Sequence, residues 1–323
     1  MKIPPKWSGA IQAVAPLIVL AVLFLGFSLA DSHFATGENL QAIIEGAAVS
    51  LVLAAGATFV ILLGSLDLSI EGVMGASAMT VVLLVKNSVN ANDFGWAGVL
   101  LALMVGVIFG CINGLLNVYA KLPSIIVTIG TWFVGLGYAY IVFPSHQPGL
   151  LYQPLIDIVL TRKLGLSLLV YVAVGVLLIA HVICRFTELG RMIYAIGGDE
   201  AMAIASGVPV GRCRIGAFII SGGLFALGGV MSAAQLENGT PAAGHDMLFS
   251  TLGAAVVGGT QLSGGRGGPL HSAAGVFILA VLANGMVQLG AGPYTRNIII
   301  GAMIVAAVAI STWHLRRKLR VVK

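Results

Sequence analysis

The chain has 323 residues, of which 58% are hydrophobic and only 9% are charged. Soluble domains carry about 25% charged residues, so this composition excludes an ordinary water-soluble globular protein. The formal net charge of +5 does not point to a nucleic-acid partner, because most lysines and arginines fall in short loops that we expect on the cytoplasmic side of a membrane.

Ten apolar segments follow one another, most of them close to the roughly 20 residues that a helix needs to cross a bilayer. Because the bilayer interior leaves backbone polar groups to pair internally, and because these segments do not alternate in polarity, we expect helices. The sequence thus predicts an all-α polytopic membrane protein with about ten transmembrane helices in one domain over residues 1–323. The expected spans lie near 10–30, 41–63, 68–86, 97–119, 123–143, 164–183, 213–234, 247–262, 269–289 and 295–313.

The distribution of basic residues predicts that both termini are cytoplasmic. In that orientation four basic residues face outward, namely Lys86, Arg162, Lys163 and Arg296. The inward-facing loops and the C-terminal tail hold the others: Lys2, Lys6, Lys121, Arg185, Arg191, Arg212, Arg214, Arg266, Arg316, Arg317, Lys318, Arg320 and Lys323. The opposite orientation would reverse this bias.

Three acidic residues lie in apolar surroundings, where an ionisable group is costly and usually has a function. Asp67 and Glu71 belong to the segment Gly64–Gly72, at the turn from the second expected span to the third. Asp67 is interpreted either as a cap of the third span or as part of a translocation pathway or gate. Glu45, near the outer end of the second span, either faces water at the interface or faces a solute.

The fourth expected span carries Gly106, Gly110 and Gly114 at four-residue spacing. Glycines at this spacing form one stripe along a helix and allow a neighbouring helix to approach closely. Asn113 and Asn117 form a second pair at the same spacing. Their amides are candidates either for bonds between helices or for contacts with a solute in the pathway.

The longest polar segment, at about 185–213, is expected in the cytoplasm. Asp199 follows two glycines and is a good helix N-cap, Ala201–Ser206 favours a short helix, and Gly207 is a plausible stop. A helix of about two turns is too short to cross a membrane and too apolar for a free loop. We interpret it as a docking element for a soluble partner, or alternatively as a surface helix at the lipid headgroups.

Motifs of enzymes and nucleotide-binding proteins are missing from the sequence. It contains no GxxxxGK[ST] phosphate-binding loop, no HExxH and no GxSxG. We therefore expect no catalytic residue, metal site or cofactor in this chain. If ATP drives its activity, another subunit must bind the nucleotide.

Four segments resemble the permease subunits of ribose-type ABC sugar importers and occur in that family's order. They are Ala57–Val73, Lys121–Trp132, Glu188–Val208 and Ala254–Gly268. The fourth is shared with branched-chain amino-acid permeases. The chain departs from the family pattern at Ser65, where a glycine is usual, and at Glu71, where a glycine is also usual.

The resemblance implies a multi-pass protein of the bacterial inner membrane that carries a monosaccharide or similar small polar solute. It implies as partners a cytoplasmic ABC ATPase subunit that binds the ATP, a periplasmic solute-binding protein and a second permease copy, identical or paralogous, in membrane lipid. In such systems a cytoplasmic loop of the permease couples to the ATPase. The residues that match this loop are Gly190, Arg191, Gly197, Gly198, Asp199, Glu200 and Gly207.

Other functions stay open at this point. An ion-gradient-driven transporter or channel would need intramembrane carboxylates, and Glu45, Asp67 and Glu71 are its candidates. An ABC permease for nucleosides or branched-chain amino acids is a further alternative. An intramembrane enzyme is disfavoured by the missing motifs.

Overall fold

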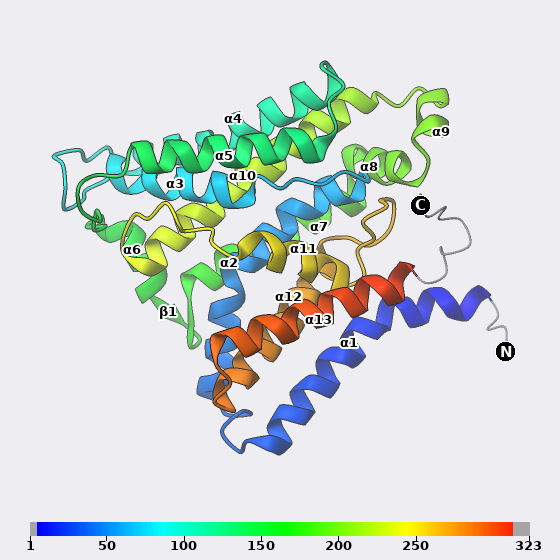
Figure 1. Cartoon of the computed structure of the whole chain (residues 1–323), viewed down its shortest axis with the longest axis horizontal. Helices are drawn as coiled ribbons and strands as arrows, with labels where there is room; N and C mark the ends of the chain where they lie inside the picture. The colour runs from blue at the N-terminus through cyan, green and yellow to red at the C-terminus, as the bar shows by residue number, and fades with distance from the viewer. Residues whose placement is uncertain (1–4, 313–323) are drawn as a thin grey trace.

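A computed structural model describes residues 5–312, and the surroundings of side chains for residues 14–309. These residues form helices joined by loops and one small hairpin (Figure 1). In chain order the elements are α1 (Pro5–Ala30), α2 (Gly37–Leu62), α3 (Ile70–Leu84), α4 (Trp96–Val118), α5 (Ser124–Ile141), α6 (Gln153–Leu160), β1 (Arg162–Lys163), β2 (Leu166–Ser167), α7 (Leu168–Phe186), α8 (Glu188–Gly198), α9 (Glu200–Ala205), α10 (Val210–Leu236), α11 (Met247–Val257), α12 (Pro269–Gln288) and α13 (Pro293–Thr312).

Six of the described helices are long and apolar enough to cross a membrane: α2, α4, α5, α7, α10 and α12. They coincide with six of the expected spans. Shorter apolar helices occupy the other four expected positions, at Val14–Ala30, Ile70–Leu84, Met247–Val257 and Pro293–Ala309. The helical class of the chain is therefore confirmed as an all-α membrane protein, and the number of ten crossings stays a prediction.

Two of the short helices are shorter than the sequence pattern indicated. α3 has 15 residues and α11 has 11. At about 1.5 Å per residue they are about 22 Å and about 16 Å long, less than the roughly 30 Å of a hydrocarbon core. Residues 258–262, expected within a span, instead begin a glycine-rich loop before α12. The expected span therefore ended too late, since the glycines, Thr260 and Gln261 at 258–261 already belong to the loop.

Irregular segments complete the path of these short helices. Residues 63–69 lead from the end of α2 to the start of α3, and residues 237–246 lead from the end of α10 to the start of α11 (Figure 1). The second segment follows α3, since Pro241 packs on Gly75 and Gly244 packs on Glu71. Non-helical backbone at membrane depth is tolerated where protein covers it or where it lines a water-filled cavity.

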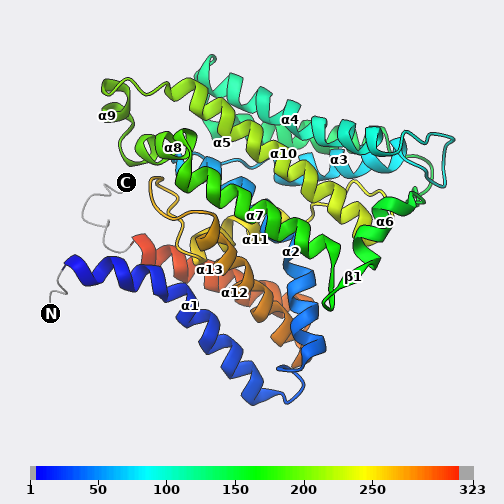
Figure 2. The same cartoon turned by 180° about the vertical axis from the view of Figure 1, so that it is seen from behind.

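The core is built around α2 and α10. Most of α2 is buried, and its side chains pack with those of α7, α10, α11 and α12. α10 lies alongside α4 in Figure 2. Side chains at Gly106, Gly110 and Gly114 would overlap the backbone of α10 at Gly222, Phe218 and Ile215. The predicted close approach along this glycine stripe is therefore confirmed.

The loops gather at two opposite ends of the molecule. α8 and α9 lie at one end, together with the N-terminal end of α1 and the C-terminal end of α13, while α6 and the β1–β2 hairpin lie at the other (Figure 1). Residues 1–4 and 313–323, which include Lys2 and the predicted cytoplasmic tail, lie outside the described residues.

Candidate functional site

The helix predicted in the polar segment is present. α9 covers Glu200–Ala205, and Asp199 is its N-cap, whose Oδ1 accepts a hydrogen bond from the backbone N of Met202 at 3.0 Å. The chain leaves this helix through Gly207, whose φ of +80° lies in the left-handed region that glycine adopts without strain. The prediction from Asp199 and Gly207 is thus confirmed for the helix itself.

α8, in contrast, was not predicted as a helix. Thr187 caps it by accepting a hydrogen bond from the backbone N of Gly190 at 3.3 Å. The signal was present in the sequence, because a capping Thr is followed by apolar residues at helical spacing. These residues are Leu189, Met192, Ile193 and Ile196. The charged residues among them made the segment look like a polar loop.

The outer surface of α8 and α9 is mixed in character. Arg191, Asp199 and Glu200 are exposed. Two large apolar side chains of α9, Met202 and Ile204, are 67% and 59% exposed. A six-residue helix with apolar side chains directed outward has not buried its own apolar surface, which is typical of an element that contacts another surface.

Gly197 connects this end of the molecule to its core. A Cβ at Gly197 would overlap the carbonyl oxygen of Leu62, the last residue of α2, and would stand 2.5 Å from the backbone N of Gly265. Gly265 in turn donates a hydrogen bond to that Leu62 oxygen at 2.9 Å. Hence the end of α2, α8 and the loop before α12 meet at one point that accommodates glycine alone.

Tyr194 makes a second attachment at the same place. Its hydroxyl donates to the carbonyl oxygen of Gly267 at 2.7 Å. Burial raises the pKa of Tyr194 to about 12, so the phenol keeps its proton and remains a donor at neutral pH. Gly190 packs on the carbonyls of Ile183 and Cys184 at the end of α7. α8 is therefore attached to the ends of α2 and α7 and to the loop before α12.

Glu200 belongs to a separate set of polar contacts. Its Oε2 accepts from Arg214 Nη2 at 2.6 Å, and Arg214 Nη1 donates to Asn117 Oδ1 at 3.2 Å. Asn117 Nδ2 donates to the carbonyl oxygen of Leu122 at 2.8 Å. These bonds join α9 to α10, α4 and the turn after α4. Asn117 therefore bonds between elements at the end of the molecule that carries α9.

Asp67 lies in a closed polar network inside the protein. Its Oδ1 accepts from the backbone N and the hydroxyl of Ser69 at 3.0 and 2.6 Å, and its Oδ2 accepts from the hydroxyl of Ser221 at 3.2 Å. Asn113 donates to Ser69 at 3.3 Å and accepts from Thr131 at 2.7 Å. All five residues are buried. Ser69 is the N-cap of α3 and no side chain makes a capping bond there, so Asp67 stabilises the turn before α3 and does not cap the helix. The placement supports the helix-bonding interpretation of Asn113.

Glu45 is held at the opposite end of the molecule from α9. Its carboxylate accepts from Gln41 Nε2 at 3.2 Å and from the backbone N of Ser167 at 3.3 Å, and it lies 3.5 Å from Arg162 Nη2. These contacts attach the β1–β2 hairpin to α2. They satisfy the carboxylate locally, so the structure gives Glu45 a positioning role for the hairpin.

Glu71 stands where α3 and α11 begin. Its Oε1 accepts from the backbone N of Leu248, in the first turn of α11, at 3.4 Å. A carboxylate at this place is favoured by the positive end of the helix dipole. The residue that departs from the family pattern thus serves as the cap of a helix distant in sequence.

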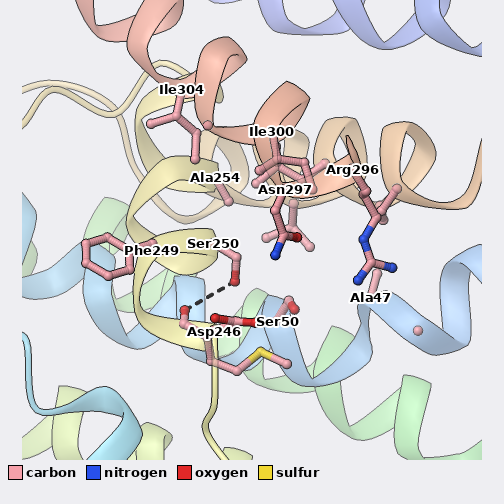
Figure 3. A pocket seen from close by; sticks show the side chains of 17 residues that line it. Ala47, Ser50, Asp246, Phe249, Ser250, Ala254, Arg296, Asn297, Ile300 and Ile304 are labelled. Carbon is pink, nitrogen blue, oxygen red and sulfur yellow. Dashed lines mark hydrogen bonds between the residues drawn. The ribbon is translucent and has the colours of Figure 1, made fainter. Parts of the chain in front are cut away.

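A cavity of about 530 Å³ opens beside the start of α11, between α2, α11, α12 and α13 (Figure 3). Most of its lining is apolar, and five polar side chains reach it: Ser50, Asp246, Ser250, Arg296 and Asn297. Figure 3 shows Asn297 directed from α13 toward Ser250 and Asp246. Of the residues predicted for a pathway, namely Glu45, Asp67, Glu71, Asn113 and Asn117, none lines this cavity.

Comparison with known proteins identifies the class to which this arrangement belongs. Residues 39–308 match the family described as the branched-chain amino acid transport system permease component. The chain belongs to this family of transport permeases. No solved structure matches it.

Curated relatives of the permease have nearly the same length. It is 29% identical to the L-arabinose transport system permease protein of Escherichia coli (strain K12), over 94% of this chain and 91% of that protein. It is 30% identical to the ribose import permease protein of the same strain, over 91% and 92%. The galactose/methyl galactoside import permease protein of that strain is 29% identical, over 93% and 94%. The predicted resemblance to sugar importer permeases is confirmed.

Sequence reasoning missed the residues that gather at the cavity of this permease. Arg296 was assigned to an outer loop, whereas it lies in the first turn of α13 and lines the cavity. Asp246 and Asn297 were not singled out. Charged residues next to apolar segments indicate candidate functional sites. Asp246 and Arg296 are both charged residues of this kind. Their convergence could not be read from the chain, because 49 residues separate them.

Proposed function

We propose that this permease is the conducting subunit of an ATP-driven importer for a monosaccharide or a similar small polar solute. The observation that carries the proposal is similarity over more than nine tenths of the chain to permeases named for L-arabinose, ribose and galactose. An external binding protein would deliver the solute and select it. The permease then needs weak contacts that release the solute quickly.

The proposed orientation places ten crossings in the bacterial inner membrane with both termini in the cytoplasm. Basic residues support it, because those at the α8–α9 end of the molecule outnumber those at the other end. At the α8–α9 end lie Lys121, Arg185, Arg191, Arg212, Arg214 and Arg266. The hairpin and α6 would then face the periplasm, where the binding protein docks.

α9 is the proposed contact with the ATPase, which binds the ATP. Its exposed Met202 and Ile204 supply apolar surface, and Arg191, Asp199 and Glu200 surround them with charge. Closure of the ATPase subunits would displace α8 and α9 together. The contacts of Gly197 and Tyr194 would pass this movement to α2 and to the loop before α12.

A second permease copy, identical or paralogous, completes the proposed assembly. One chain leaves large apolar side chains exposed on α4 and α5, among them Leu100, Ile108, Ile126 and Phe133. Lipid covers such surface in a membrane protein, and so does a neighbouring subunit.

The decisive experiment reconstitutes the permease with its ATPase and binding protein in liposomes and measures uptake of labelled L-arabinose, D-ribose and D-galactose. We expect uptake of one of these sugars. This uptake should require ATP on the side of the membrane where the ATPase lies, and it should persist when an uncoupler abolishes the ion gradient. Uptake by the permease alone, abolished by the uncoupler, would instead establish an ion-gradient-driven transporter.

A further inference from the structure

The charged and amide side chains that line the cavity beside α11 make few contacts with the rest of the described structure. The Asp246 carboxylate is 73% exposed and lies beside the His245 ring, with 3.7 Å between Nε2 and Oδ2. Within residues 14–309, the side chains of Arg296 and Asn297 have no hydrogen-bond or ion-pair partner. Asp246 and Arg296 thus line one cavity without forming an ion pair with each other.

The backbone at Asp246 explains why its carboxylate does not cap α11. Asp246 directly precedes α11 and would ordinarily cap that helix, but its φ of +63° is left-handed and its side chain makes no capping bond. Glu71 of α3 accepts the hydrogen bond from Leu248 instead. Left-handed backbone at a residue other than glycine is uncommon and concentrates at functional sites. The fold therefore directs the Asp246 carboxylate away from the helix end, next to the cavity.

The chemistry of the lining restricts the kind of ligand. One carboxylate and one guanidinium leave the cavity without net charge, which disfavours a charged solute. A carboxylate accepts bonds from two neighbouring hydroxyls, while an amide and a guanidinium donate to hydroxyl oxygens. The apolar remainder, including Ala47, Leu279 and Ile300, matches the C–H surface of a sugar ring. A volume of about 530 Å³ has room for a monosaccharide and some water.

We propose that this cavity is the site at which the permease binds its solute during transport. Asp246, Asn297 and Arg296 bind the hydroxyl groups of a neutral monosaccharide, and Ser50 and Ser250 complete the polar side. This inference rests on the proposed function and adds the site. Few polar groups in a mostly apolar cavity bind weakly, which suits a solute that must leave within each transport cycle.

The test compares solute carried per ATP hydrolysed in the reconstituted complex. We expect Asp246→Asn to lower this ratio about tenfold, as the loss of one charge-assisted bond to a hydroxyl predicts, and Asn297→Ala to lower it several-fold, as the loss of one neutral bond predicts. Asn also tolerates the left-handed backbone, so Asp246→Asn removes the charge with little effect on the turn. Asp93→Asn, in the exposed loop before α4, is the matched control and keeps the wild-type ratio.

A second measurement does not depend on transport. Ser250→Cys is labelled with a charged thiol reagent in membranes, with and without the sugar that the wild type carries. The sugar should slow this labelling several-fold, whereas a sugar that is not carried should have no effect. Ser145→Cys, in an exposed loop, controls for general effects on the reagent.

The outcomes separate the two proposals. The cavity is not the solute site if the wild type carries a sugar and both cavity variants carry as much solute per ATP as the wild type. The same conclusion follows if the sugar leaves Ser250→Cys labelling unchanged. In both cases the proposed importer function is unaffected. If the wild type carries L-leucine and no sugar, the proposed solute and this site both fail. Should Asp246→Asn not assemble, Asn297→Ala and the labelling experiment decide.

Discussion

Two acidic residues of this permease, Asp67 and Asp246, lie at the starts of two short helices and have opposite surroundings. Asp67 is 1% exposed and accepts three hydrogen bonds from Ser69 and Ser221. Asp246 makes no capping bond and its side chain is 73% exposed, beside a cavity. A carboxylate whose acceptors are all used holds the fold together, whereas one with free acceptors is available to a solute. Residue type alone does not distinguish these roles.

The largest effect is expected where a larger side chain is introduced into the tightly packed contact between α4 and α10. A side chain at Gly110 would overlap the Phe218 backbone, so Gly110→Leu should prevent the approach of α4 to α10 and leave no folded permease. Gly46 lines the cavity and has no atom within 4 Å of an added Cβ. Gly46→Ala should therefore fold normally. Size-exclusion profiles in detergent measure both, and equal profiles would show that the two regions do not differ in packing.

The next effect comes from removing each carboxylate. Asp67→Ala leaves Ser69 and Ser221 without an acceptor in a buried place, which should cost about 2–4 kcal/mol of stability. Asp246→Asn removes the charge of an exposed group, tolerates the left-handed backbone and should change stability by less than about 1 kcal/mol. Thermal denaturation of the purified permease gives the order of the two. The reverse order would contradict the conclusion that Asp67 stabilises the fold and Asp246 does not.

An intermediate case is the ion pair at the proposed ATPase contact, which is partly exposed on both sides. Glu200→Arg should place two cations together, remove the 2.6 Å contact with Arg214 and reduce ATP-driven transport about tenfold. The stability change should stay near 1 kcal/mol, because exposed pairs contribute little. The double variant Glu200→Arg with Arg214→Glu should recover part of the transport. No recovery would mean that the pair itself is not what couples α9 to α10.

The smallest effect is expected at Tyr194. Tyr194→Phe keeps the ring and removes the 2.7 Å bond to Gly267, at a cost of about 1 kcal/mol. Because the pKa of Tyr194 is raised to about 12, ionisation of this phenol cannot change transport between pH 6 and pH 9, roughly, so the wild type and the variant should have pH profiles of the same shape. Parallel profiles at slightly different rates would agree with an attachment that is only structural.

The sequence by itself determined the class of this protein, because apolar length and scarce charge leave a bundle of membrane helices as the available solution. It also placed α9, since Asp199 and Gly207 act on the backbone next to them and need no distant partner. α8 was predictable from Thr187 and a helical spacing of apolar residues, although its charges concealed it. The spacing of Gly106, Gly110 and Gly114 predicted a close helix contact without naming α10 as the partner.

Only the tertiary structure decided which polar residues use their hydrogen bonds within the fold and which remain available to bind a solute. Whether a carboxylate is satisfied depends on donors supplied by other helices, such as Ser221 for Asp67, 154 positions away. The start of α11 is a second example, because Glu71 of α3 accepts the hydrogen bond from its first turn and the adjacent Asp246 does not. Such contacts depend on how the helices are rotated and packed against one another, and the periodicity of one chain does not contain that information.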